Sequence, residues 1–104
     1  MLHRLNELTD IPLIGSFYLE HKAEELIKLE RFEEGLQIAN DLVESRFSHR
    51  SYHLWLSKAK AELGLKLYEE CEESLSRASA YARGRWDDYR ISLIMDTVNI
   101  NKAF

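Results

Sequence analysis

Residues 66–75 read KLYEECEESL, and a shorter string of the same kind, ERFEEGL, occupies residues 30–36. In both strings an aromatic residue is followed by two glutamates and then by a small residue, Cys71 in one and Gly35 in the other. The two strings lie 36 residues apart, and similar segments at a fixed offset indicate an internal repeat. The chain is therefore expected to contain two copies of one structural unit.

The same offset aligns further apolar and small positions on either side of the two strings. It pairs Leu19 with Trp55, Ala23 with Ala59, Phe32 with Tyr68, Gly35 with Cys71, Ala39 with Leu75, and Leu42 with Ala78. Apolar residues recur at spacings of three and four within each copy, which is typical of amphipathic helices. The small residues allow two helices to approach closely, and the aromatic residue opens the second helix. Each copy is thus predicted to be a helical hairpin.

Composition favours an all-α fold. The chain has 104 residues, of which 45% are hydrophobic and 31% are charged, with only four glycines and a single proline, Pro12. A sandwich or barrel of short strands needs turn residues at regular spacing, so this composition argues against one. The length fits a single domain.

The pattern divides this single domain into four consecutive parts. These are an N-terminal arm or short helix (1–15), a first hairpin (16–48), a second hairpin (49–84) and a C-terminal capping helix (85–104). Pro12 disfavours helix in the residue before it, and Ser16 is a candidate N-cap for the first helix of the hairpin. The last helix carries more apolar residues than packing on one neighbour requires. It is therefore a candidate interface as well as a cap.

The two hairpins resemble the tetratricopeptide repeat (TPR), whose period is about 34 residues. The resemblance rests on the twelve aligned positions and covers residues 16–84. Lys22 and Lys58 depart from the family pattern because leucine is frequent at that position, and Glu62 stands where a large apolar or aromatic residue is usual. The resemblance implies an α-solenoid fragment that binds another protein and is not an enzyme.

In this family the first helices of the hairpins line a concave groove that binds peptides or helices. By the alignment, the partner-binding residues are expected to be Phe17, His21, Ile27, His53, Leu56, Lys60 and Leu63, with Trp86 on the last helix. The apolar members of this set suit an amphipathic helix or an apolar segment. Glu20 and Glu24 would repel the acidic C-terminal tail that one subclass of the family grips. The alternative is that these side chains pack on the N-terminal arm or on the last helix.

Three functions remain open from the sequence. The first is a protein-interaction module or small chaperone, of which the type III secretion chaperones are one example. The second is a structural subunit that self-assembles, for example as a homodimer, through its last helix. The third is a nucleic-acid-binding repeat, which the net charge of −4 disfavours because such binding needs a basic surface. Arg83, Arg85 and Arg90, interleaved with aromatic residues, better suit a protein interface.

No catalytic residue, metal ligand set or cofactor is predicted. Cys71 is the single cysteine, so it forms no intramolecular disulfide, and a reducing compartment is expected. His49 and His53 lie four residues apart but lack the further ligands that a zinc site needs. The N-terminus has no signal-peptide core and no segment is apolar enough to span a membrane, so a cytoplasmic location is expected.

Overall fold

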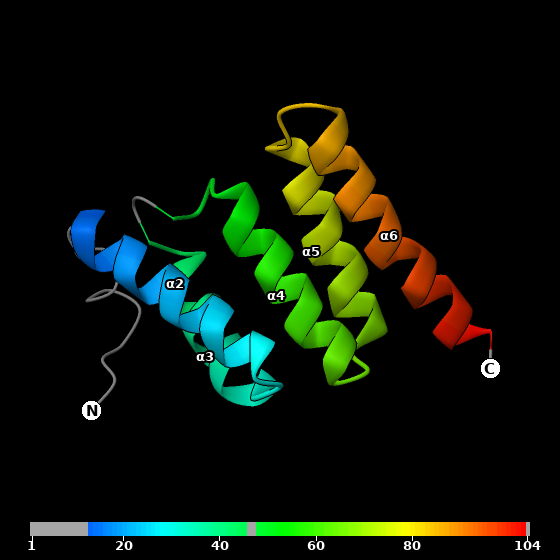
Figure 1. The fold of residues 1–104 in the computed structure, drawn as a ribbon, viewed down its shortest axis with the longest axis horizontal. Coiled ribbons are helices and arrows are strands. Elements are labelled where there is room, and N and C mark those ends of the chain that lie inside the picture. The colour runs from blue at the N-terminus through cyan, green and yellow to red at the C-terminus, as the bar shows by residue number, and fades with distance from the viewer. Residues whose placement is uncertain (1–12, 46–47, 104) are drawn as a thin grey trace.

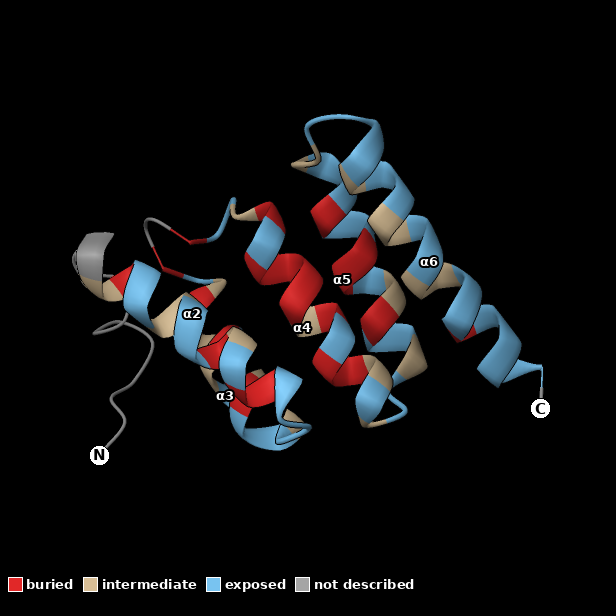
Figure 2. Ribbon diagram, in the orientation of Figure 1, coloured by how far each residue is buried: buried red, intermediate tan, exposed pale blue. Residues whose placement is uncertain are grey.

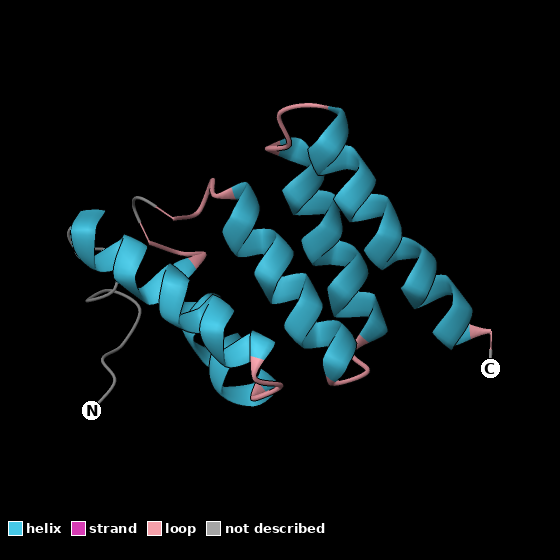
Figure 3. Cartoon of the chain, viewed as in Figure 1, coloured by secondary structure: helices cyan, strands magenta, loops and turns pink. Residues whose placement is uncertain are grey.

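The structure is a computed structural model that describes residues 13–45 and 48–103 (Figure 1). The described residues form the helices α2 (Leu13–Lys28), α3 (Phe32–Leu42), α4 (Tyr52–Gly64), α5 (Tyr68–Ala80) and α6 (Arg85–Lys102). They contain no strand (Figure 3), which confirms the predicted all-α fold. The expected arm over residues 1–12 lies outside the described part of the chain.

The helices pack in chain order around α4. Each helix contacts the next one along the chain, and α4 also contacts α2 and α6. Helices α2 and α3 form the first hairpin, and α4 and α5 form the second. Figure 2 shows the result: buried residues concentrate on α4, whereas α6 is exposed along most of its visible face.

The two hairpin turns have the same backbone conformation. In the first turn Glu30 has a φ of 61°, and the amide of Arg31 donates to the carbonyl oxygen of Leu26 at 2.9 Å. In the second turn Lys66 has a φ of 63°, and the amide of the next residue donates to the carbonyl oxygen of Glu62 at 2.8 Å. Both turns are Schellman motifs, which end a helix on a residue in the left-handed region. Corresponding residues of the two turns lie 36 positions apart.

The aromatic and small residues lie where the sequence placed them. Phe32 is the first residue of α3 and Tyr68 is the first residue of α5. Ala23 is fully buried in the first hairpin. A Cβ on Gly35 would lie 2.6 Å from Cγ1 of Ile27, so α2 and α3 approach each other at a point where only glycine fits without a shift.

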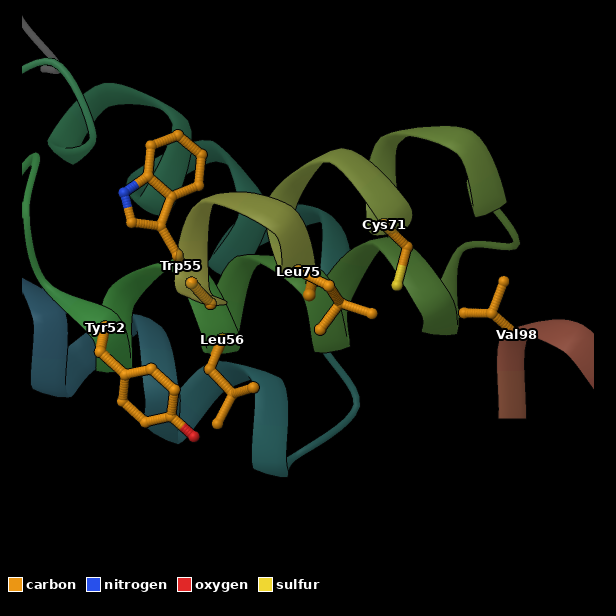
Figure 4. Packing of buried hydrophobic residues seen from close by; sticks show 8 residues of the cluster. Tyr52, Trp55, Leu56, Cys71, Leu75 and Val98 are labelled. Atoms are coloured by element: carbon orange, nitrogen blue, oxygen red, sulfur yellow. The ribbon is translucent and has the colours of Figure 1, made fainter. Parts of the chain in front are cut away.

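The main core lies between α4, α5 and α6. Its buried members are Tyr52, Trp55, Leu56, Ala59, Cys71, Leu75, Ala78 and Val98. Figure 4 shows these side chains spread along the contact of α4 and α5, with Val98 of α6 at one end. A smaller cluster of Ala39, Leu42 and Leu54 joins the first hairpin to α4. The fold is therefore continuous from α2 to α6, with α4 in both clusters.

Two helix starts differ from the predictions. Helix α2 begins at Leu13, so Ser16 is not an N-cap: it lies inside the first turns, is 1% exposed, and its hydroxyl has no hydrogen-bond partner among the described residues. Helix α4 begins at Tyr52, three residues into the predicted second hairpin (49–84), because Ser51 caps it by accepting a hydrogen bond from the amide of Leu54 at 3.1 Å. A capping hydroxyl at this position stabilises a helix start by about 1 kcal/mol.

Candidate partner-binding surface

A groove between α2 and α4 brings together three residues predicted from the sequence. Phe17 and His21 of α2 and His53 of α4 line it and are all exposed. The groove has a volume of about 330 Å³ and also contacts Glu20, Glu24, Leu54 and Ser57. We call it the α2/α4 groove. Its lining mixes one aromatic ring with imidazoles and carboxylates, so it is suited to a polar or amphipathic ligand and not to a purely apolar one.

One carboxylate of this groove is engaged inside the protein. Glu20 accepts hydrogen bonds from the hydroxyl of Ser48 at 2.7 Å and from the hydroxyl of Ser51 at 3.0 Å. Because Ser51 is also the N-cap of α4, Glu20 fixes the start of α4 against α2. Its role is to position the two walls of the groove.

Two of the predicted site residues are buried instead. Ile27 is 6% exposed and lies against Gly35, and Leu56 is 2% exposed and belongs to the same core cluster as Val98. Leu63 is half-buried beside that cluster. Of the apolar residues predicted to bind a partner on α2 and α4, Ile27 and Leu56 therefore belong to the protein's interior, whereas Phe17 is exposed. Periodicity identified these residues as apolar but could not show which side of each helix the next helix covers.

Four large apolar side chains are exposed on α6. Trp86, Tyr89, Leu93 and Ile100 are 67%, 52%, 49% and 61% exposed, respectively. Their spacings of three, four and seven place them on one side of a helix, opposite the side that buries Val98. The rings of Trp86 and Tyr89 stack with their centres 5.5 Å apart. We call these four residues the α6 row. Trp86 was predicted from the sequence to bind a partner. The other residues of the row were not, although the seven-residue spacing of Trp86, Leu93 and Ile100 could have indicated that they lie on one side of the helix.

Three cations, one on each of α2, α4 and α6, lie near enough for their charges to influence one another. They are Lys28, Lys60 and Arg90, and we call them the cation cluster. The pKa of Lys60 is lowered, first by burial and then by the positive charges of Arg90 and Lys28, while the Glu24 carboxylate opposes this. None of the three makes an ion pair with a described residue.

A second hollow, of about 540 Å³, lies where α4 begins and α5 leads into α6. The hydroxyl of Tyr52 donates to the carbonyl oxygen of Asp87 at 3.2 Å, and the amide of Arg83 donates to the Asp87 carboxylate at 2.9 Å. Burial is also the main reason that the pKa of Tyr52 is raised. These bonds tie the start of α6 to α4, so we assign this hollow a structural role.

Away from the groove, α4 and α5 share a buried polar network. Glu62 is 2% exposed and accepts hydrogen bonds from Nζ of Lys58 at 2.5 Å and from the hydroxyl of Ser74 at 2.6 Å. Nζ of Lys58 and the guanidinium of Arg77 lie 5.7 and 5.5 Å from the ring centre of Trp55. Lys58 and Glu62 are the two departures from the family pattern in this hairpin. The structure shows that they compensate each other.

The remaining residues considered for catalysis or metal binding are a cysteine and two histidines, and none of them lies in a reactive setting. Cys71 is fully buried, and burial together with the nearby carboxylates raises its pKa to about 11, so the thiol stays protonated at neutral pH. His49 precedes α4 and its Nδ1 lies 3.0 Å from the carbonyl oxygen of Ser45, so it shares no helix face with His53. Within residues 13–45 and 48–103 no three His, Cys, Asp or Glu side chains are grouped so that they could hold a metal ion.

None of the described helices is both long enough and apolar enough to cross a bilayer. The chain matches no protein-family model, no curated protein and no solved structure. Its function is therefore inferred from the surface itself, above all from the α2/α4 groove and the α6 row.

Proposed function

We propose that the protein is a protein-interaction module that holds an amphipathic segment of a partner against α2, α4 and α6. The observation that supports this most is the α6 row, because large apolar side chains are exposed along one side of a helix whose other side packs against the core through Val98. Contiguous exposed apolar surface of this kind marks interaction sites in soluble proteins.

The size of the row fits this role. A large aromatic side chain has roughly 150–250 Å² of surface, so Trp86 and Tyr89 expose together roughly 200–300 Å². Covering that area contributes roughly 5–7 kcal/mol before the entropy cost of association is subtracted. Tryptophan and tyrosine are also the residues that most often dominate binding energy at interfaces.

Within this proposal the protein acts as a small cytoplasmic chaperone that shields an amphipathic segment of its partner. The size of the chain, its acidic balance and the TPR-like order of helices support this form. The α2/α4 groove then contacts the polar side of the segment through His21 and His53.

Site-specific photocrosslinking in the cells that make the protein tests the proposal. Leu93 is replaced by p-benzoylphenylalanine, and the same residue is placed at Ser76 as a control, because Ser76 is exposed on α5 away from the row. We expect an adduct with a different protein from position 93 and none from position 76. No adduct from either position, or the same adducts from both, contradicts the proposal.

Self-assembly through α6 is the second candidate function, because the same α6 row could contact a second copy. In that case position 93 gives an adduct of twice the chain mass. Sedimentation velocity then shows a dimer that Leu93→Glu dissociates. A strict monomer at high micromolar concentration excludes this candidate.

A further inference from the structure

The α2/α4 groove presents its side chains along α2 in a fixed order. Phe17 comes first, His21 lies about one turn later, and Glu24 lies about one turn beyond that. Glu24 makes no ion pair with a described residue, whereas Glu20 between them is bound by two serine hydroxyls. From Phe17 to Glu24 the helix rises roughly 10 Å. The groove therefore offers an aromatic ring, an imidazole and a carboxylate in that order.

The segment that precedes α2 carries the complementary side chains in the reverse order. Residues 1–12 read MLHRLNELTDIP and lie outside the described part of the chain. Read backward from the start of α2, the segment supplies Leu8, then Glu7, then Arg4. From Leu8 to Arg4 an extended chain spans roughly 13 Å, comparable with the length of the groove along α2. Apolar, acidic and basic side chains thus match the ring, the imidazole and the carboxylate.

The position of the segment in the chain favours the same register. It ends where α2 begins, at Leu13, and the groove starts about one turn further on, at Phe17. A segment that returns from this point along the groove has to run antiparallel to α2, which is the direction that the reversed order requires. A short tether of this kind gives the segment an effective concentration in the millimolar range.

Resting on the protein-interaction function proposed above, we propose that residues 2–8 occupy the α2/α4 groove of the free protein and that a partner displaces them. Successive side chains of an extended segment point to opposite sides. Leu8 then contacts Phe17 on the α2 wall. Arg4, on the same side of the segment, pairs with Glu24.

The other side of the segment faces the α4 wall of the groove. Glu7 points to this side, where His53 lines the groove. In the proposed function the partner's polar side contacts the groove through His53 and His21. The segment and the partner therefore compete for the same imidazoles, and the protein's own chain covers the groove until a partner replaces it.

A spin label tests the docking in the whole chain. Asn6→Cys is labelled with a nitroxide, which reacts at this site alone because the thiol of Cys71 is fully buried. In nuclear magnetic resonance spectra we expect the amide signals of Ser57 and Leu54 in the groove to lose at least about half of their intensity. The signal of Asn101, near the end of α6, should keep its intensity.

Charge reversal separates docking from mere tethering. Arg4→Glu and Glu24→Arg should each weaken the docking about three-fold, because each removes an exposed charge pair, and the broadening at Ser57 should fall. The double variant exchanges the two charges and should restore the broadening. Lys66→Glu, which makes the same change of charge in the α4–α5 turn, should change nothing. Broadening that Arg4→Glu leaves intact, or the absence of broadening in the native sequence, overturns the proposal.

A mixed sample identifies the chain that supplies the segment. Half of the molecules carry nitrogen-15 without a spin label, and the other half carry the spin label without nitrogen-15. Groove signals that stay sharp in this mixture show that each segment binds its own chain. Broadened signals mean that a second copy supplies the segment, which overturns docking within one chain.

Photocrosslinking separates this inference from the function on which it rests. With p-benzoylphenylalanine at position 93, Arg4→Glu should raise the yield of the partner adduct about three-fold, because less of the groove is covered by the segment. Lys66→Glu should leave the yield unchanged. If the spin label shows docking but the yield does not rise, displacement by the partner is wrong. If no variant gives an adduct, the interaction function fails and displacement fails with it, while the docking stands.

Discussion

The two hairpins share one backbone plan but fill it with different chemistry. At the positions where the first hairpin has Leu26 and Ile38, the second has Glu62 and Ser74, 36 residues later. Leu26 is buried as an apolar side chain, whereas Glu62 is buried in hydrogen bonds to Lys58 and Ser74. The turn geometry is nevertheless the same in both hairpins. The turn geometry is therefore set by the local backbone and by the spacing of the two helices. It is compatible with either an apolar or a polar interior of the hairpin.

The largest expected effect comes from breaking the polar interior. Lys58→Met leaves the Glu62 carboxylate buried without a counter-charge, and removing one partner of a buried pair costs about 3–5 kcal/mol. Urea unfolding followed by circular dichroism measures this loss in the free energy of unfolding. The matched control is Lys22→Met at the exposed equivalent position in the first hairpin, where we expect a change within about 0.5 kcal/mol.

A triple variant checks that the loss comes from the unpaired charge. Lys58→Met, Glu62→Leu and Ser74→Ile together give the second hairpin the interior of the first. Replacement of a whole buried ion pair by apolar residues is often neutral or stabilising by about 1–4 kcal/mol. A triple variant less stable than Lys58→Met alone contradicts this account of the network.

The helix crossings give the second test, of intermediate size. Gly35→Cys gives the α2–α3 crossing the side chain that the α4–α5 crossing has at the equivalent position. A Cβ at residue 35 would lie 2.6 Å from Ile27. Overpacking of this kind costs about 1–3 kcal/mol. The reverse change, Cys71→Gly, deletes a fully buried core side chain and places a glycine in a helix, so it should cost about 2 kcal/mol. A Gly35→Cys variant that unfolds at the same temperature as the native chain would contradict the close approach of α2 and α3.

The smallest effect should come from the turns. Glu30 and Lys66 both have positive φ, a conformation that costs a residue with a Cβ about 1–2 kcal/mol. Glycine removes that cost but orders a more flexible residue, so Glu30→Gly and Lys66→Gly should each raise the free energy of unfolding by about 0.5–1 kcal/mol. Urea titrations of the two variants should agree. A gain in one turn alone would show that the turns differ in a way their dihedral angles do not record.

The repeat predicted much of the fold because the aromatic and small residues report directly on helix starts and crossings. Phe32 and Tyr68 begin α3 and α5 as expected. The start of α2 was predicted wrongly because Gly15 and Ser16 read as a break, whereas Ser16 is buried inside the helix. The partner of Glu62 could not be predicted, because Ser74 meets it only once α5 folds back along α4.

The candidate surface was predicted in part for a similar reason. Phe17 and Trp86 were expected to be exposed and are 62% and 67% exposed, respectively. Leu56 was also predicted to bind a partner, but it is buried in the core. Helix α4 is contacted by α2, α3, α5 and α6, so little of its surface is left exposed. Periodicity shows that a residue is apolar, and only the tertiary arrangement shows whether another helix covers it.

The two tryptophans of this chain lie in opposite surroundings. Trp55 is 9% exposed in the core, where its indole nitrogen donates to the carbonyl oxygen of His49 at 2.9 Å, while Trp86 is 67% exposed at the head of the α6 row. The emission of Trp55 therefore follows unfolding, and that of Trp86 follows whatever covers α6. The protein thus contains two indole fluorophores, one that reports on its stability and one that would report on the proposed binding to α6.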